Sequence, residues 1–129
     1  MGLFSKKPAS SSSMTDWLYA ADKVYNYAIT THIIQGVSKY FEGNAATYIL
    51  NIVNSNRKEH QGLERYRRVE FKLNTSDGTT AMYTKSVTYD NVKLQYGVSV
   101  AVGDAYQEQW TISKASGSLK VCGIKRLFA

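Results

Sequence analysis

The sequence is poor in the residues that staple small domains or hold metal ions. Its 129 residues include one cysteine and two histidines. Cys122 has no second cysteine to pair with, so an intrachain disulfide and a cysteine-based zinc site are excluded. His32 and His60 stand far apart, without the spacing of metal ligands. We therefore expect no metal and no cofactor, and a fold held together by its hydrophobic core.

Long apolar runs are absent as well. The longest candidates, Tyr48–Val53 and Val98–Val102, fall far short of the ~20 residues that a membrane-spanning helix needs. Residues 1–14 lack the apolar stretch of a secretory signal. We therefore expect a cytoplasmic location, and the alternative is a soluble piece of a larger protein.

What is present is the composition of one globular domain. A chain of 129 residues with 43% hydrophobic and 20% charged residues suits a single core. Residues 1–14 form a polar leader that contains the lone proline and a serine run, so we expect a disordered leader followed by one domain over 15–129. The net charge of +6 permits an anionic partner without requiring one.

The first half of the domain has a helical period. After Thr15, an N-cap candidate, apolar residues recur at three- and four-residue steps as far as Phe41. Gly43 stands where a glycine ends a helix. The pattern predicts one long amphipathic helix from Thr15 to Gly43.

A second, shorter helix is expected directly afterwards. Asn44 is placed to cap it, and its apolar face reaches about Val53. The polar segment 54–62 fits either a loop or a third, frayed helix that runs through Arg65.

From Tyr66 the period changes from helical to alternating. Val69, Phe71 and Leu73 alternate with charged residues, as in a half-buried strand, and Ser76–Gly78 has the composition of a hairpin turn. Five strands are expected, beginning near Tyr66 and continuing as Thr80–Tyr89, Val92–Val102, Tyr106–Lys114 and Leu119–Phe128.

In the last strand Ile124 is out of phase with Leu119 and Val121, and a bulge at Cys122–Gly123 would restore the register. Helices that precede strands predict an α+β fold. We expect a long N-terminal helix plus one or two short helices packed on a curved five-stranded antiparallel sheet, shaped like a cone with a mouth at one end.

The end of the chain carries a more specific pattern. A Trp-containing strand, Gln109–Lys114, is followed by a short turn and the strand Ser118–Ile124. With the element order, this hairpin resembles the closing hairpin of nuclear transport factor 2-like domains in the cystatin-like superfamily, although Leu119 replaces a second tryptophan. Two branches are closest: the C-terminal domain of the mitochondrial import-motor anchor, and the periplasmic domain of the type IV secretion assembly protein. Glu108-Gln109-Trp110 departs from the Asp-x-Trp signature of the first branch.

The resemblance implies where catalysis would lie if the chain were an enzyme. Enzymes of this fold use an Asp or an Asp/His pair deep in the cone, so His32 and Glu108 are the catalytic candidates, with His32 as general base. The alternatives are a structural histidine and a carboxylate at the open end of the sheet. Because the chain carries no GxSxG, P-loop, GxGxxG or HExxH motif, we expect a protein that is not an enzyme. The resemblance leaves an isomerase or dehydratase type of activity as an alternative.

A basic cluster marks the predicted helix-to-strand junction. Arg65, Arg67 and Arg68, with Tyr66 among them, could bind the phosphates of nucleic acid or of an anionic membrane. The alternative is a solvated edge, because glutamates are interleaved with the arginines.

Tyrosine is the strongest compositional bias. Ten tyrosines against four phenylalanines suit surfaces that are apolar yet wet, although ordinary sheet packing explains them as well. We expect a Tyr-rich open sheet face, with Tyr96 and Trp110 as binding candidates. The predicted function is a non-enzymatic protein-binding or assembly module, a homodimeric component of a translocation or secretion machine, and the alternatives are the enzyme and the phosphate binder.

Overall fold

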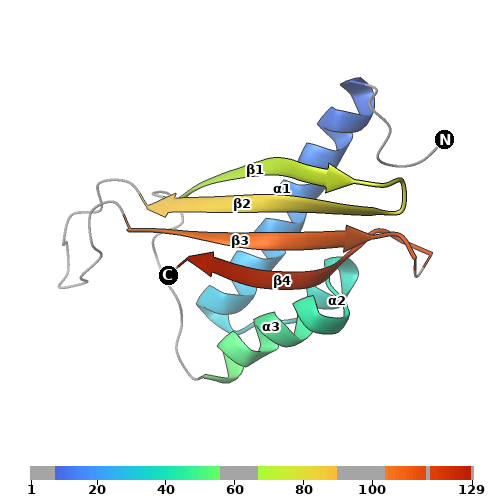
Figure 1. Cartoon of the computed structure of the whole chain (residues 1–129). Coiled ribbons are helices and arrows are strands. Elements are labelled where there is room, and N and C mark those ends of the chain that lie inside the picture. Colours follow the sequence, from blue (N-terminus) through green and yellow to red (C-terminus); the bar gives the residue numbers. More distant parts are fainter. Residues whose placement is uncertain (1–7, 56–66, 90–103, 116, 129) are drawn as a thin grey trace.

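Three helices precede four strands along the chain (Figure 1). The structure, a computed structural model, describes residues 8–55, 67–89, 104–115 and 117–128. The helices are α1 (Pro8–Thr31), α2 (Val37–Tyr40) and α3 (Gly43–Asn54). The strands are β1 (Arg67–Ser76), β2 (Thr80–Tyr89), β3 (Asp104–Ser113) and β4 (Lys120–Phe128).

The four strands form one antiparallel sheet in the order β1-β2-β3-β4. Figure 1 shows α1 crossing one face of this sheet at an angle, with α2 and α3 beside β4. The fold is therefore α+β, but the predicted five-stranded sheet is wrong. β2 pairs with β3 along its whole length, from Thr80 opposite Ser113 to Tyr89 opposite Asp104, so no strand lies between them. The strand predicted at Val92–Val102 falls in 90–103, outside the described residues.

Alternating burial shows which face of the sheet α1 covers. The α1-facing residues of β2 and β3 are buried: Ala81, Tyr83, Lys85, Val87, Tyr89, Tyr106, Glu108, Trp110 and Ile112. The tyrosines of these strands therefore face the core, because they share its phase along each strand. The expected Tyr-rich open face is wrong for β2 and β3.

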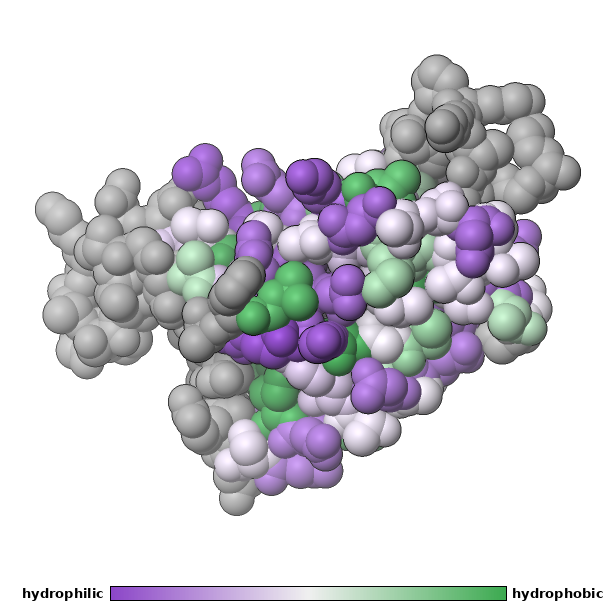
Figure 2. Space-filling view, viewed as in Figure 1, coloured by the Kyte–Doolittle hydropathy of each residue, from purple (hydrophilic) through white to green (hydrophobic). Residues whose placement is uncertain are grey.

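The opposite face of the sheet is polar instead. Apart from Met82 and Ala105, the residues that β2 and β3 present there are polar: Thr80, Thr84, Ser86, Thr88, Gln107, Gln109 and Thr111. Figure 2 shows this side of the molecule as a mixture of hydrophilic and near-neutral residues with scattered hydrophobic ones.

The long helix differs from its prediction at both ends. α1 begins at Pro8, before Thr15, and ends at Thr31, well before Gly43. The Thr30 hydroxyl donates to the Asn26 carbonyl (2.8 Å), and the Thr31 hydroxyl accepts from the Ile33 amide (3.2 Å). Threonine and isoleucine are poor helix formers, and such side-chain bonds compete with the helical ladder. The chain then turns at His32, whose φ of 64° is left-handed.

The segment before α3 closes the outer edge of β4. The Glu42 amide donates to the Val121 carbonyl (2.9 Å), and Phe41 forms a parallel bridge with Val121. Asn44, predicted to cap the helix, instead accepts a hydrogen bond from the Ile124 amide (3.1 Å), and Glu42 stands at the N-cap position. These contacts attach α3 to the end of the sheet.

Two local predictions in the sheet are confirmed. The turn between β1 and β2 is held by Asp77, whose Oδ1 accepts from the Thr79 and Thr80 amides, while Gly78 has a φ of 96°. In β4 the register shifts between Gly123 and Val121, so Cys122 is the extra residue of a bulge. The bulge brings both Val121 and Ile124 into the core.

Candidate functional site

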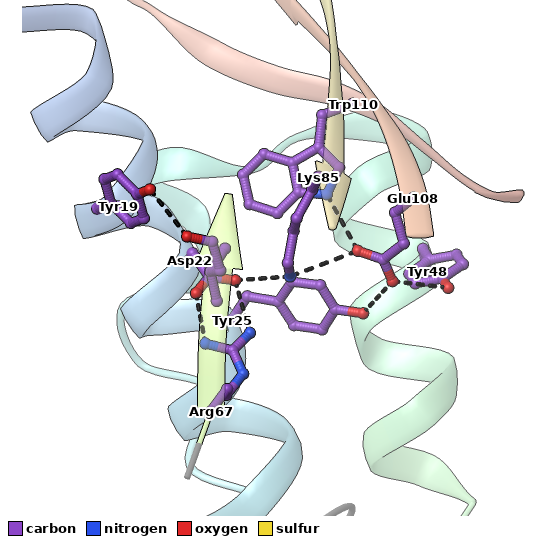
Figure 3. A network of polar contacts seen from close by, with 9 residues as sticks. Tyr19, Asp22, Tyr25, Tyr48, Arg67, Lys85, Glu108 and Trp110 are labelled. Atoms are coloured by element: carbon purple, nitrogen blue, oxygen red, sulfur yellow. Dashed lines mark hydrogen bonds and ion pairs between the residues drawn. The ribbon is translucent and has the colours of Figure 1, made fainter. Parts of the chain in front are cut away.

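Four charged side chains meet beneath α1 in the middle of the sheet (Figure 3). Asp22 comes from α1, Arg67 from β1, Lys85 from β2 and Glu108 from β3. Lys85 and Glu108 are 0% exposed and Asp22 is 3% exposed. Two carboxylates and two cations balance in charge, and we call this group the charge network.

Strand register and helix phase bring these residues together. Lys85 lies directly opposite Glu108 in the β2–β3 ladder, in the α1-facing phase of both strands. Asp22 is buried on α1 between Leu18 and Tyr25, on the side of the helix that faces the sheet. The folding of α1 onto the sheet therefore joins the fourth member to the three from the strands.

Asp22 is the centre of one half of the network. The Arg67 guanidinium donates to both carboxylate oxygens, at 2.6 Å to Oδ2 and 2.9 Å to Oδ1. The Lys85 ammonium lies 2.6 Å from Oδ1. A bidentate arginine and a second cation are the contacts that a buried carboxylate needs to remain charged.

Lys85 connects the two carboxylates. Its Nζ lies 3.5 Å from Oε1 of Glu108 and approaches Asp22 without hydrogen-bond alignment, so it acts there as a charge. Aromatic rings supply the rest of its surroundings: Nζ lies 4.0 Å from the centroid of the Tyr25 ring and 4.9 Å from that of Trp110. Lys85 is 0% exposed, and cation–π attraction at a site closed to solvent contributes to holding the ammonium.

Glu108 has hydrogen-bond donors on both oxygens. The hydroxyls of Tyr25 and Tyr48 donate to Oε2 at 2.6 and 3.0 Å, and the Trp110 indole donates to Oε1 at 3.1 Å. The donors come from α1, α3 and β3, as Figure 3 shows. Glu108 therefore links three elements from the interior of the domain.

The contacts among Asp22, Lys85 and Arg67 shift the pKa of each of these three groups toward its ionised form. Burial alone would raise the pKa of Asp22, but the charge of Lys85 and the hydrogen bonds from Arg67 overcome it and lower that pKa. Burial alone would lower the pKa of Lys85, and the charge of Asp22 reverses this, so the pKa is raised. The pKa of Arg67 is raised by Asp22 in the same way, against burial.

The tyrosines beside Glu108 are held in their protonated form. Burial, and then the charge of Glu108, raise the pKa of Tyr25 well above its ordinary value. The same two causes raise the pKa of Tyr48 to about 12. A deprotonated tyrosine here would face a carboxylate at hydrogen-bond distance.

These shifts predict how stability depends on pH. The pKa of Asp22 is lower in the folded chain, so its contribution is present above the unfolded value of about 4 and is lost as pH falls through the folded pKa. The raised pKa of Tyr48 acts oppositely: its contribution is present below about 10 and is lost as pH rises toward about 12. The raised pKa of Tyr25 acts in the same direction as that of Tyr48.

Urea unfolding at stepped pH is expected to give a plateau in the free energy of unfolding near neutral pH and a fall at both ends. The variant Tyr48→Phe should show a smaller alkaline fall than the parent chain. An alkaline fall that is unchanged in Tyr48→Phe would contradict this assignment.

A surface groove reaches one side of the charge network. It has a volume of about 480 Å³ and is lined by Asp22 and Arg67 together with Tyr19, Lys23 and Val69, among others. The Tyr19 hydroxyl donates to the Val69 carbonyl at 2.8 Å. Asp22 and Arg67 face this groove already paired with each other, and Glu108 is not in its lining.

The predicted catalytic residues lie in different surroundings. Glu108 is sealed in the charge network, with Tyr25, Tyr48, Trp110 and Lys85 as its partners. His32 follows the last residue of α1, where the backbone turns away from the helix. Within the described residues, no three His, Cys, Asp or Glu side chains gather in a way that suits a metal ion.

The predicted basic cluster is divided by the sheet. Arg67 faces α1 and is occupied by Asp22, whereas Arg68 is exposed on the opposite face. Arg65, Tyr66 and the binding candidate Tyr96 lie outside the described residues.

The remaining binding candidate, Trp110, is 0% exposed at the centre of the core. Its ring contacts those of Phe41, Phe71 and Tyr25, with centroid distances of 5.5, 5.1 and 6.1 Å.

Sequence reasoning missed four residues of the site: Asp22, Tyr25, Tyr48 and Lys85. A usable signal existed for one of them. Lys85 stands in phase with the apolar residues Tyr83 and Val87, just as Glu108 stands in phase with Tyr106 and Trp110. Charges of opposite sign in the buried phase of two strands predict a buried ion pair.

Comparisons with known proteins show a shared fold. No protein-family model matches the sequence, and no curated protein matches it. The crystal structure of the intermembrane space region of chloroplast protein ARC6 is similar, with a TM-score of 0.52 and 12% identity over 92% of this chain and 96% of that one. This likeness supports a related α+β fold, and the resemblance to the cystatin-like superfamily remains a prediction. Within the part of the chain that the structure describes, no helix has the length and apolar character to cross a membrane.

Proposed function

We propose that the chain is a non-enzymatic protein-binding or assembly module that acts through its surface. The observation that carries the proposal is the state of Glu108, the carboxylate that an enzyme of this fold would be expected to use. It is 0% exposed, and both of its oxygens accept hydrogen bonds from side chains of the domain. A general acid or base must reach a substrate proton directly or through one water molecule. The arrangement favours a structural use of the charge network.

Exposed apolar side chains support a binding role. Tyr27 is 52% exposed, Leu73 is 51% exposed, and Ile33 and Ile34 are 43% and 44% exposed. Single exposed apolar residues are common, but those that bind a protein partner lose their contact with water in the complex. Leu73 lies on β1 at the sheet edge. Tyr27 lies near the C-terminal end of α1, and Ile33 and Ile34 follow that end directly.

Site-specific photo-crosslinking in the cells that make the chain would test this proposal. A photoreactive residue placed at Leu73, Tyr27 or Ile34 is expected to give a protein adduct of discrete mass at one position at least. A photoreactive residue at Lys125, exposed on β4 at the opposite end of the strand order from β1, is the control and is expected to give none. Absence of a discrete adduct at all three apolar positions would contradict the proposal.

A further inference from the structure

The two edge strands of the sheet, β1 and β4, differ in what contacts their outer sides. The outer edge of β4 is covered by the segment before α3, where Phe41 forms a parallel bridge with Val121. The Glu42 amide donates to the Val121 carbonyl, and the Asn44 side chain accepts from the Ile124 amide. β1 lies at the other end of the strand order, and within the described residues it pairs with β2 alone. An edge strand presents a row of amides and carbonyls that another chain can extend.

The direction of these backbone groups follows from the strand period. Side chains and backbone amides both alternate with a period of two, so all α1-facing residues of β1 direct their amides and carbonyls to the same side. The Val69 carbonyl bonds to the Tyr19 hydroxyl, and on β4 the α1-facing Val121 carbonyl bonds outward to Glu42. Both observations place the amides and carbonyls of Phe71 and Leu73 on the side away from β2.

The sequence of β1 is complementary to itself when two copies run antiparallel. With Phe71 opposite Phe71 of a second copy, Val69 lies opposite Leu73 and Glu70 lies opposite Lys72, each pair occurring twice across the two-fold axis. Glu70 and Lys72 are exposed on the polar face, and Leu73 is 51% exposed on the α1 side. Opposite charges and apolar pairs directly across a strand pair stabilise it, and like charges destabilise it.

We infer that β1 is the interface for a second copy of this chain, which adds its own β1 antiparallel across a two-fold axis at Phe71 and joins two sheets into one. The inference rests on the proposed function and names the partner. The groove between α1 and β1 lies beside the Arg67–Val69 part of this edge. The Val69 carbonyl already accepts from the Tyr19 hydroxyl there, and its second lone pair is the one that the Leu73 amide of the second copy would use. Figure 1 shows the first turns of α1 extending past β1.

Sedimentation equilibrium of the purified chain over a range of concentrations tests the inference. The parent chain is expected to dimerise reversibly. Lys72→Glu places two pairs of like charges across the axis and is expected to raise the dimer dissociation constant by about tenfold or more. Glu70→Lys/Lys72→Glu reverses both partners of each pair and is expected to restore the parent value to within about threefold.

A matched control is available on the same row of the polar face. Lys72, Thr84, Gln109 and Lys125 follow one another across the four strands, so Lys125→Glu makes the same charge change at the far edge. It should leave dimerisation unchanged. Leu73→Pro removes an amide that points away from β2, and it is expected to weaken the dimer while circular dichroism stays that of the parent chain.

The outcomes separate the inference from the proposed function. A monomeric parent chain, or a double variant that stays as weak as Lys72→Glu, overturns the β1 interface. If the chain is monomeric but the photo-crosslink at Leu73 captures a different protein, the proposed function stands and the second copy is wrong. If the chain is monomeric and no position gives an adduct, both fail.

Discussion

Replacing Lys85 with methionine is expected to lower the free energy of unfolding by about 3–5 kcal/mol. The ammonium lies between Asp22 and Glu108, at 2.6 and 3.5 Å from their oxygens. Its removal leaves two buried carboxylates with one remaining cation, Arg67, which contacts Asp22. Taking away one partner of a buried ion pair is costly because the other charge stays buried without compensation.

Urea unfolding followed by circular dichroism measures this effect. Lys125→Met is the matched control, because Lys125 is exposed, and its free energy of unfolding should stay within about 0.5 kcal/mol of the parent value. The double variant Lys85→Met/Glu108→Gln should lose less than the two single variants lose in sum, since each single change leaves the other charge unpaired. Two results would contradict the role of Lys85 as the cation that compensates both buried carboxylates. One is a double variant whose loss of unfolding free energy equals the sum of the two single losses, and the other is a loss below about 1 kcal/mol in Lys85→Met.

The second large effect is expected at Trp110. Replacement by alanine should lower the free energy of unfolding by about 3–5 kcal/mol, because the indole is 0% exposed and packs against the rings of Phe41, Phe71 and Tyr25. It also removes the indole donor to Glu108. Phe71 comes from the edge strand β1, and Phe41 comes from the segment that bridges to the opposite edge strand, β4. The cavity would therefore border side chains from both edges of the sheet.

Chemical denaturation of Trp110→Ala and Trp110→Phe separates these contributions. Trp110→Phe keeps most of the ring packing and loses the hydrogen bond to a charged acceptor, so about 1.5–3 kcal/mol is expected. If Trp110→Ala costs no more than Trp110→Phe, the ring packing described above is not what holds this part of the core.

The local sequence pattern was sufficient to predict most features of the sheet. The alternation of Val69 and Phe71, the Asp77–Gly78 turn and the bulge at Cys122 were all readable from neighbours in sequence. These features depend on a strand period of two and on turn chemistry that acts over a few residues.

Features that depend on competition between distant segments were not readable. The apolar stripe continues past Thr31, yet the helix ends there, and the chain then turns back until the Glu42 amide bonds to Val121 of the distant strand β4. Likewise the alternation at Val92–Val102 predicted a third strand, whereas β2 pairs directly with β3. Periodicity indicates that a segment can form a strand, and the sheet decides which strands are adjacent.

The candidate site was readable in part. Glu108 stood out because a carboxylate occupied an apolar phase, but its partners Lys85 and Tyr25 come from elements 23 and 83 residues away along the chain. The cluster of arginines was treated as one patch, although consecutive strand residues face opposite sides. Arg67 is therefore buried against Asp22 while its neighbour Arg68 is exposed.

In the structure proposed here to act as a binding module, the charge network holds the fold while the edge of β1 makes the contacts. Measuring unfolding free energy and dimer dissociation constant together on Lys85→Met and Lys72→Glu tests it most directly, at a temperature where both variants are folded. We expect a crossed result: Lys85→Met loses stability and keeps the parent dimer dissociation constant, whereas Lys72→Glu keeps its stability and raises that constant by about tenfold or more. A stable Lys85→Met that no longer associates, or a Lys72→Glu that associates as the parent chain does, would contradict it.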